Sequence, residues 1–169
     1  MITKFIRSLG YALKGICTGI KEERNVRIDI VVAFYVLVFS AFYDLTVTQK
    51  VLLVFICFTV LGFELMNTAV ERAVDRPDKE HYMQAGEAKD TAAGGVLLVA
   101  TGAAVAGVML FWDVEVFAEI FTFFTTRPFM LICLALTLFA SYKFITAGFV
   151  DNPYGQNEIY ALARGKINF

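Results

Sequence analysis

Four polar residues follow a long apolar run and share one face of a predicted helix. The sequence places them 3, 4 and 4 residues apart, directly after the apolar residues 51–63: Glu64, Asn67, Glu71 and Asp75. At about 100° per residue, their side chains fall within an arc of roughly 80°. Because Glu64 adjoins the apolar run, its carboxylate is costly there unless it is paired, binds a metal or faces water.

A second polar cluster begins the next apolar segment on the same side of the membrane. It contains an acid, a lysine and another acid: Glu87, Lys89 and Asp90. Phosphoryl transfer from a nucleotide requires a divalent cation, a cation on the phosphates and a group that orients the attacking hydroxyl. Mg²⁺ prefers oxygen ligands and takes one or two protein carboxylates. The two clusters together predict metal–nucleotide chemistry on a lipid.

Individual roles follow from residue type and predicted depth. Glu71, together with Glu22 or Glu23, is the candidate pair of Mg²⁺ ligands. Lys89 is the candidate contact to the phosphates of the nucleotide. Glu64, the deepest acid, is the candidate general base for a lipid hydroxyl.

The same acids also fit two other interpretations. Glu71 and Asp75 can form ion pairs on a hydrated helix face, and the sequence offers three cations nearby: Arg72, Arg76 and Lys79. The competing functional class is a non-enzymatic transporter or channel subunit in which Glu64 and Glu71 bind ions. Inverted repeats or paired broken helices would favour that class, and the sequence shows neither.

The composition predicts an integral membrane protein with a single helical bundle. The chain is 58% hydrophobic and its mean hydropathy is +0.64, well above the values of soluble domains. Its three cysteines are dispersed and apolar in setting, so they predict packing and no disulfide framework. The net charge is −1, and no nucleic-acid partner is expected.

Four apolar segments predict membrane spans, namely residues 28–43, 51–66, 91–112 and 129–149. The first two are short for a bilayer and would reach the interface by extending through polar helical ends. The second is expected to continue as helix through Val74 and to stop before Pro77. The third is rich in glycine and alanine, which favours close helix packing in lipid. Residues 4–20 repeat apolar side chains every 3 or 4 positions, which predicts an amphipathic helix that acts as an anchor or gates the substrate.

The cations predict the orientation in the membrane. Residues 4–27 carry six Lys or Arg and residues 72–89 carry four, whereas residues 113–126 carry three acids and no cation. The positive-inside rule therefore places both termini and the loop at 76–90 in the cytoplasm. We expect a multi-pass protein of the inner, or plasma, membrane with its active site on the cytoplasmic face.

Residues 62–77 resemble the signature of the prokaryotic diacylglycerol kinase family, which includes undecaprenol kinases. The family core reads E-x-x-N-[ST]-A-x-E-x-x-x-D, and residues 86–94 resemble its A-K-D-x-x-[AS]-[AG] segment. Residues 10–15 and 22–29 also fit without gaps. The resemblance covers residues 4–112, about two thirds of the chain, and residues 22–28 are more similar to the undecaprenol kinase branch.

This resemblance implies a surface helix and three membrane spans, a homotrimer with shared sites, ATP as co-substrate and Mg²⁺ as cofactor. By motif position, Glu64 matches the catalytic base and Asn67 its supporting amide. The metal-binding acids correspond to Glu23 and Glu71. The remaining matches are nucleotide contacts at Tyr11, Lys89 and Asp90, and residues near the lipid hydroxyl at Arg27 and Asp29.

The chain departs from the family pattern in two places. The loop reads Glu80-His81-Tyr82 where the family has Glu-Tyr-His or Glu-Lys-His. The family core ends near Trp112, whereas residues 113–169 add a predicted outer interfacial helix, a fourth span and a cytoplasmic tail. We therefore expect two parts: a lipid kinase core at residues 1–112 and an additional segment at 113–169.

The expectation is an all-α integral membrane lipid kinase. It would phosphorylate the hydroxyl of undecaprenol or diacylglycerol with ATP, and yield undecaprenyl phosphate or phosphatidic acid. The partners expected are ATP, the lipid substrate, the bilayer and further copies of the chain.

Overall fold

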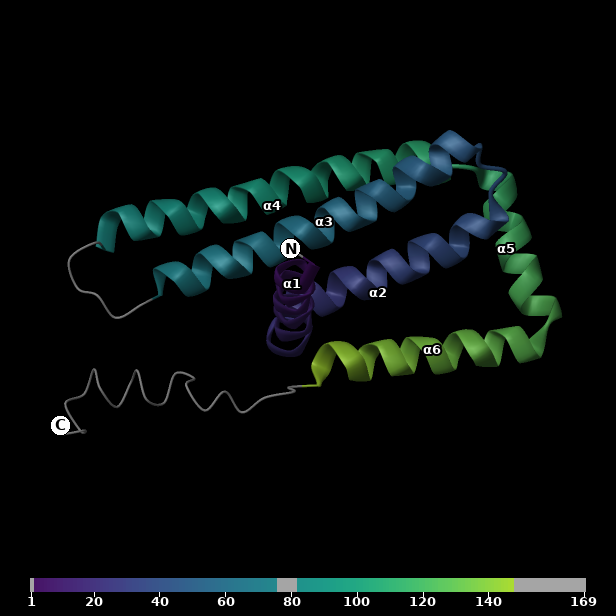
Figure 1. Ribbon diagram of the computed structural model, residues 1–169. Coiled ribbons are helices and arrows are strands. Elements are labelled where there is room, and N and C mark those ends of the chain that lie inside the picture. The colour runs from purple at the N-terminus through teal and green to yellow at the C-terminus, as the bar shows by residue number, and fades with distance from the viewer. Residues whose placement is uncertain (1, 76–81, 148–169) are drawn as a thin grey trace.

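The computed structural model describes residues 2–75 and 82–147, and all regular structure within them is helical (Figure 1). Within these two ranges, six α-helices and one 3₁₀-helix follow one another: α1 (Ile2–Glu22), α2 (Arg24–Phe39), η1 (Ser40–Phe42), α3 (Val47–Val74), α4 (Tyr82–Phe111), α5 (Val114–Thr126) and α6 (Pro128–Thr146). This confirms the all-α class predicted from the sequence.

Four of the described helices are long and apolar enough to cross a membrane, which confirms the predicted spans. They cover Arg24–Phe42, Val47–Val74, Ala85–Phe111 and Pro128–Thr146. Each apolar segment extends into polar residues at one or both ends, so even the short first segment reaches 19 residues. At 1.5 Å per residue, 19 residues span about 28 Å, close to the hydrocarbon thickness of a bilayer.

The ends of these helices have identifiable local causes. Thr46 and Gln49 form a capping box that starts α3. The helix ends at Val74 with Asp75 as its cap, as expected, while Pro77 lies outside the described residues. Asp113 caps α5 through its side chain, and Pro128 occupies the first turn of α6.

The four spanning helices lie side by side in the order α4, α3, α2, α6 (Figure 1). The antiparallel pair α3 and α4 forms the most extensive contact, as the small residues of the third span predicted. At Gly95 of α4, an added Cβ would lie 3.6 Å from the ring of Phe63, an ordinary packing distance. α6 packs on the opposite side of the bundle, against α2.

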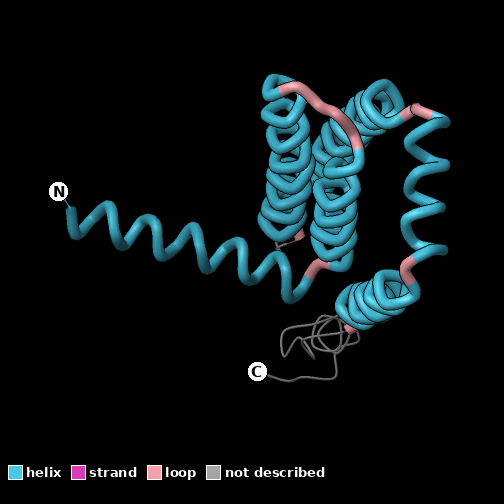
Figure 2. The backbone as a smooth tube through the Cα atoms, turned by 90° about the vertical axis from the view of Figure 1, so that its right-hand side faces the viewer, coloured by secondary structure: helices cyan, strands magenta, loops and turns pink. Residues whose placement is uncertain are grey.

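Two helices lie across the ends of this bundle. α5 connects α4 to α6 and crosses the end of the bundle at which α4 finishes and α6 begins, which we call the outer end (Figure 1). α1 leaves the other end at Glu23 and projects sideways beyond the spans (Figure 2). Its apolar stripe is exposed, with Phe5 at 70% and Leu9 at 52%. Such a face suits the headgroup region of a bilayer.

A small buried cluster closes the outer end of the bundle. It consists of Tyr43, Leu45 and Leu53, where the connection between α2 and α3 meets the end of α4. The Tyr43 hydroxyl donates a hydrogen bond of 3.0 Å to the Phe111 carbonyl in the last turn of α4. Burial and the negative charge of Asp113 raise the pKa of the Tyr43 phenol, which keeps this donor protonated.

Candidate functional site

Four residues of α3, Glu64, Asn67, Glu71 and Asp75, form a polar row that passes from the interior of the bundle to its surface. Glu64 is 5% exposed and Thr68 is 6% exposed, whereas Asp75 is exposed at the end of the helix. Thr68 follows Glu64 by one helical turn, and its burial was not predicted, although its position beside Asn67 in the motif is a usable signal. The deep acid is therefore withdrawn from the surface, as its place in the sequence indicated.

Asn67 and Glu71 form a hydrogen-bonded pair one turn apart. The Asn67 amide Nδ2 donates to Glu71 Oε1 at 3.3 Å. Its other polar atom, Oδ1, is buried and has no hydrogen-bond partner in the described part of the chain. A buried acceptor without a partner is uncommon in folded proteins and is often explained by a ligand, an ion or water.

Arg72 joins the first two helices to α3. Its guanidinium lies 3.0 Å from Glu22 Oε2 and 3.0 Å from Glu23 Oε1. The sequence allows Arg72 to pair with Glu71 or Asp75, whereas its ion pairs here are with Glu22 and Glu23. This ion pair holds Glu23 beside α3. Because Arg72 directly follows Glu71, Glu23 lies close to that part of the polar row.

Lys89 of α4 pairs with Asp75 at the end of α3. Its ammonium lies 3.1 Å from one carboxylate oxygen and 3.2 Å from the other. The sequence allowed Asp75 to form an ion pair with a cation nearby in the chain. In the structure its partner is Lys89 of the neighbouring helix α4. Asp90, the next residue of α4, is exposed.

Asp29 lies near Glu64 on the facing helix α2. The two carboxylates are close enough to interact electrostatically, and Asp29 is partly buried. These two acids, on the neighbouring helices α2 and α3, are thus within electrostatic range of each other. The role of both acids at the lipid hydroxyl stays a prediction.

Arg27 is 5% exposed, and its described hydrogen bonds go to backbone carbonyls. Its Nη1 donates to the carbonyls of Ile20 at 3.1 Å and Lys21 at 2.9 Å, and its Nε donates to Ile145 at 3.4 Å. This dual contact with the ends of α1 and α6 was not predicted, because no local pattern indicates it.

The remaining predicted contacts lie apart from this row or outside the described residues. Tyr11 is 70% exposed on α1, which projects from the bundle (Figure 2). Glu80 and His81 are outside the described residues, and only the backbone of Tyr82 is described, as the start of α4. The role of Tyr11 as a nucleotide contact stays a prediction.

The acids present suit Mg²⁺ by their chemistry. Within residues 2–75 and 82–147, no group of three or more His, Cys, Asp or Glu side chains is arranged around one point. Mg²⁺ does not need such a group, because it usually takes one or two protein carboxylates and completes its shell with water and phosphate. Glu23, Glu71 and the unpaired Asn67 Oδ1 offer hard oxygen atoms of this kind.

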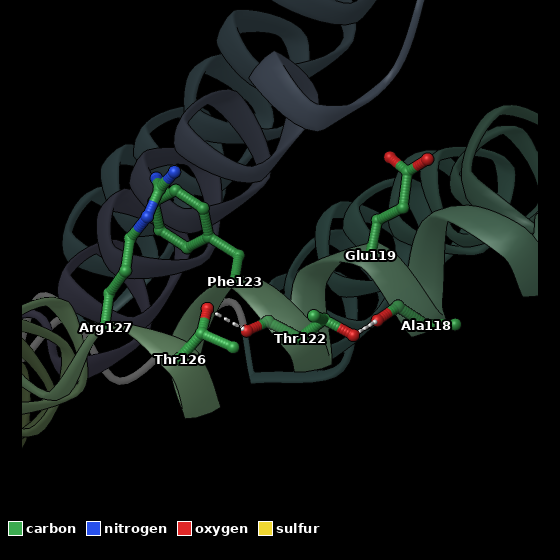
Figure 3. Close-up of a pocket in the computed structure, with 6 residues that line it drawn as sticks. All are labelled: Ala118, Glu119, Thr122, Phe123, Thr126 and Arg127. Carbon is green, nitrogen blue, oxygen red and sulfur yellow. Dashed lines mark hydrogen bonds between the residues drawn. The ribbon is translucent and has the colours of Figure 1, made fainter.

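A shallow hollow at the outer end of the bundle is separate from these residues. It has a volume of about 380 Å³ and is lined by α5 and Arg127 (Figure 3). The Arg127 guanidinium lies 4.4 Å from the centre of the Phe123 ring. The hollow is open and holds none of the motif residues, so we assign it no catalytic role.

Comparison with known proteins identifies the family. Residues 10–111 match the model of the family described as prokaryotic diacylglycerol kinase, and this stretch contains the polar row of α3 and its partners on α2 and α4. The chain belongs to the prokaryotic diacylglycerol kinase family. It is therefore a membrane-bound lipid kinase.

Relatives in this family carry two different names. The undecaprenol kinase of Bacillus subtilis (strain 168) is 29% identical over 110 residues, which are 65% of this chain and 89% of that relative. The diacylglycerol kinase of Escherichia coli (strain K12) is 29% identical over 111 residues, or 66% and 91%. That of Haemophilus influenzae (strain ATCC 51907 / DSM 11121 / KW20 / Rd) is 30% identical over 97 residues, or 57% and 82%.

Proposed function

We propose that this kinase transfers the γ-phosphoryl group of ATP to the hydroxyl of a membrane lipid at the cytoplasmic face. The observation that carries the proposal is the polar row on α3. In it the buried acid Glu64, the amide of Asn67 with a free acceptor, the half-buried Glu71 and the exposed Asp75 follow one another at helical spacing. Such a row leads from hydrocarbon to water. A lipid hydroxyl and a nucleotide approach it from opposite directions.

The deep end of the row is assigned to the lipid. Glu64 accepts the proton of the attacking hydroxyl or orients that hydroxyl, and Asp29 lies close enough to share this task. Asn67 holds Glu71 in place through its amide. General base catalysis of this kind contributes about 100-fold to 10,000-fold to a rate.

The surface end is assigned to the nucleotide. Lys89 exchanges Asp75 for the phosphates of ATP, with Asp90 and Tyr11 as further contacts. Glu23 and Glu71 would hold Mg²⁺, which offsets the negative charge of the phosphates when it is bound. Because Glu23 pairs with Arg72, that arginine keeps the acid beside α3 in the absence of the metal.

The setting of the reaction follows from the charge distribution. We propose an inner or plasma membrane location with the active site and both termini on the cytoplasmic side, and the cations near the inner ends of the spans support this orientation. Residues 1–112 would form the kinase core and 113–169 an added segment. We propose a homotrimer, as the resemblance implies, because exposed apolar faces on α3 and α4 remain available for other copies.

The lipid is undecaprenol or diacylglycerol, the substrates named for the two groups of relatives. The experiment supplies the purified full-length chain in detergent micelles with γ-labelled ATP, Mg²⁺ and a panel of lipids that contains undecaprenol, diacylglycerol and ceramide. Wild-type protein should label one class of lipid. Residues 22–28 favour undecaprenol.

Glu64→Gln and Glu71→Gln test the assigned roles. Each should lower turnover at least about 100-fold while the protein elutes and melts like wild type, because the folded bundle keeps its shape. Glu119→Gln on α5 is the matched control, since it makes the same chemical change at the outer end. Full turnover in both inner variants would refute their roles. A wild-type protein inactive on every lipid would favour the ion-binding alternative.

A further inference from the structure

The additional helices α5 and α6 both contact α2, although the family match ends at residue 111. Three contacts mark the inner, middle and outer levels of this interface, and they join Arg27 to the Ile145 carbonyl at 3.4 Å, Tyr35 to Ser141 at 3.3 Å, and Phe39 to Phe124 at 6.1 Å between ring centres. The first two contacts hold α6 against α2, and the third joins α2 to α5.

The inner contact joins three helices through one side chain. The Arg27 guanidinium belongs to α2, donates to Ile20 and Lys21 in the last turn of α1, and donates to Ile145 in the last turn of α6. Carbonyls in the last turn of a helix lack partners within the helix and attract cations. We call this group, formed by Arg27 and the three carbonyls, the Arg27 junction.

The Arg27 junction lies next to residues that the proposed function places in the site. Glu22 and Glu23 directly follow Lys21 and hold Arg72 of α3 at 3.0 Å each. Asp29 comes two residues after Arg27 and interacts with Glu64. A shift of the junction therefore moves α1 and the start of α2, and with them the acids on both sides.

We propose that α6 acts through the Arg27 junction as a positioning element for the kinase site. Arg27 is then a positioning residue whose place is set by α6, in contrast to a direct contact with the lipid. This inference rests on the proposed function. It assigns a role in activity to the segment after residue 111, which lies beyond the part of the chain that matches the family.

Arg27→Lys and Ser141→Trp disturb the junction from its two sides. Lysine keeps the charge but lacks the planar fork that reaches two helix ends. Tryptophan at 141 removes the bond to Tyr35 and separates α6 from α2. Each variant should lower kcat/KM for the lipid about tenfold, as the loss of a supporting contact typically does. The double variant should also lose about tenfold, because both changes break the same unit.

Ala140→Trp is the matched control, since Ala140 is the exposed neighbour of Ser141 on α6. It should keep wild-type kinetics. If Ser141→Trp does not yield folded protein, Ser141→Leu takes its place. Leucine also removes the hydrogen bond to Tyr35 and displaces α6 by a smaller amount. A direct lipid contact by Arg27 would give a different pattern, in which Arg27→Lys lowers kcat/KM and Ser141→Trp behaves like wild type. That result would overturn the inference.

A distance measurement separates this inference from the proposed function. Spin labels at Lys14→Cys on α1 and Phe58→Cys on α3 report the α1–α3 distance in a full-length chain whose native cysteines are replaced by serine. Arg27→Lys and Ser141→Trp should each broaden the distance distribution, and Ala140→Trp should not. If wild type phosphorylates no lipid, broadening still supports the junction while the proposed function fails. An unchanged distribution in both variants overturns the junction whatever the activity.

Discussion

Lys89 has two competing partners for its positive charge. In the structure it binds Asp75, and in the proposed reaction it binds the phosphates of ATP. The side chains of this pair are 39% and 60% exposed, and exposed ion pairs contribute about 0–1 kcal/mol to stability. A pair this weak is readily exchanged for a nucleotide. The ion pair of Lys89 with Asp75 is therefore compatible with the proposed contact of Lys89 to the phosphates of ATP.

Substitutions at the two partners separate the pair from the nucleotide contact. Asp75→Asn should change the free energy of unfolding by less than about 0.5 kcal/mol, as most surface changes do. Lys89→Gln should raise the KM for ATP about tenfold, because a charge-assisted hydrogen bond to phosphate is worth about 1.5–3 kcal/mol. Thermal melting and ATP titration of the labelling reaction measure the two effects. An equal rise of KM in both variants would show that the pair itself matters for activity.

At the scale of elements, α1 is held at one end only. Gly19 is buried, and a Cβ added there would collide with the Leu65 side chain of α3. Gly15, one turn earlier, has open space around it. Of the two glycines, Gly19 thus lies where α1 closely approaches the Leu65 side chain of α3, whereas Gly15 carries no packing constraint within the described chain.

Valine at these two positions tests that difference. Gly15→Val should keep or slightly raise thermal stability, because glycine is a poor helix former. Gly19→Val should loosen the end of α1 and lower the melting temperature, since Leu65 must move to admit the new side chain. Protease sensitivity within α1 should rise in the second variant alone. Equal behaviour of the two variants would contradict the close approach of Gly19 to α3.

At the scale of the whole molecule, the outer end is a folding anchor distinct from the site. Tyr43, Leu45 and Leu53 bring the α2–α3 connection, α3 and the end of α4 together. The acids and cations of the site lie at the other end of the spans. The buried apolar cluster and the proposed site thus lie at opposite ends of the bundle.

Leu53→Ala should therefore lower stability without changing the chemistry. Leu53 is 4% exposed, and its truncation should cost about 2 kcal/mol, the low end of the range for buried leucine, because lipid is as apolar as the protein interior. Leu52, which is 51% exposed on the same helix, is the matched control and should tolerate alanine. Melting in detergent measures stability, and kcat below the melting range should match wild type. A loss of kcat at low temperature would mean that the outer end also shapes the site.

The sequence by itself determined the helices, the spans, and the fact that Glu64, Glu71 and Asp75 share one face of α3. These features are local: an apolar segment in lipid must satisfy its own backbone hydrogen bonds, and helical spacing fixes which side chains share a face. The motif at residues 62–77 placed Glu64 deep and Asp75 at the helix end, and the structure has them there.

The tertiary structure decided which partners meet across helices. Arg72 pairs with Glu22 and Glu23, Asp75 pairs with Lys89 of the next helix, and Arg27 joins the ends of α1 and α6. Such pairs depend on the relative depth and rotation of separate helices. Those two quantities are set by side-chain packing between the helices, and no periodicity within one segment encodes them.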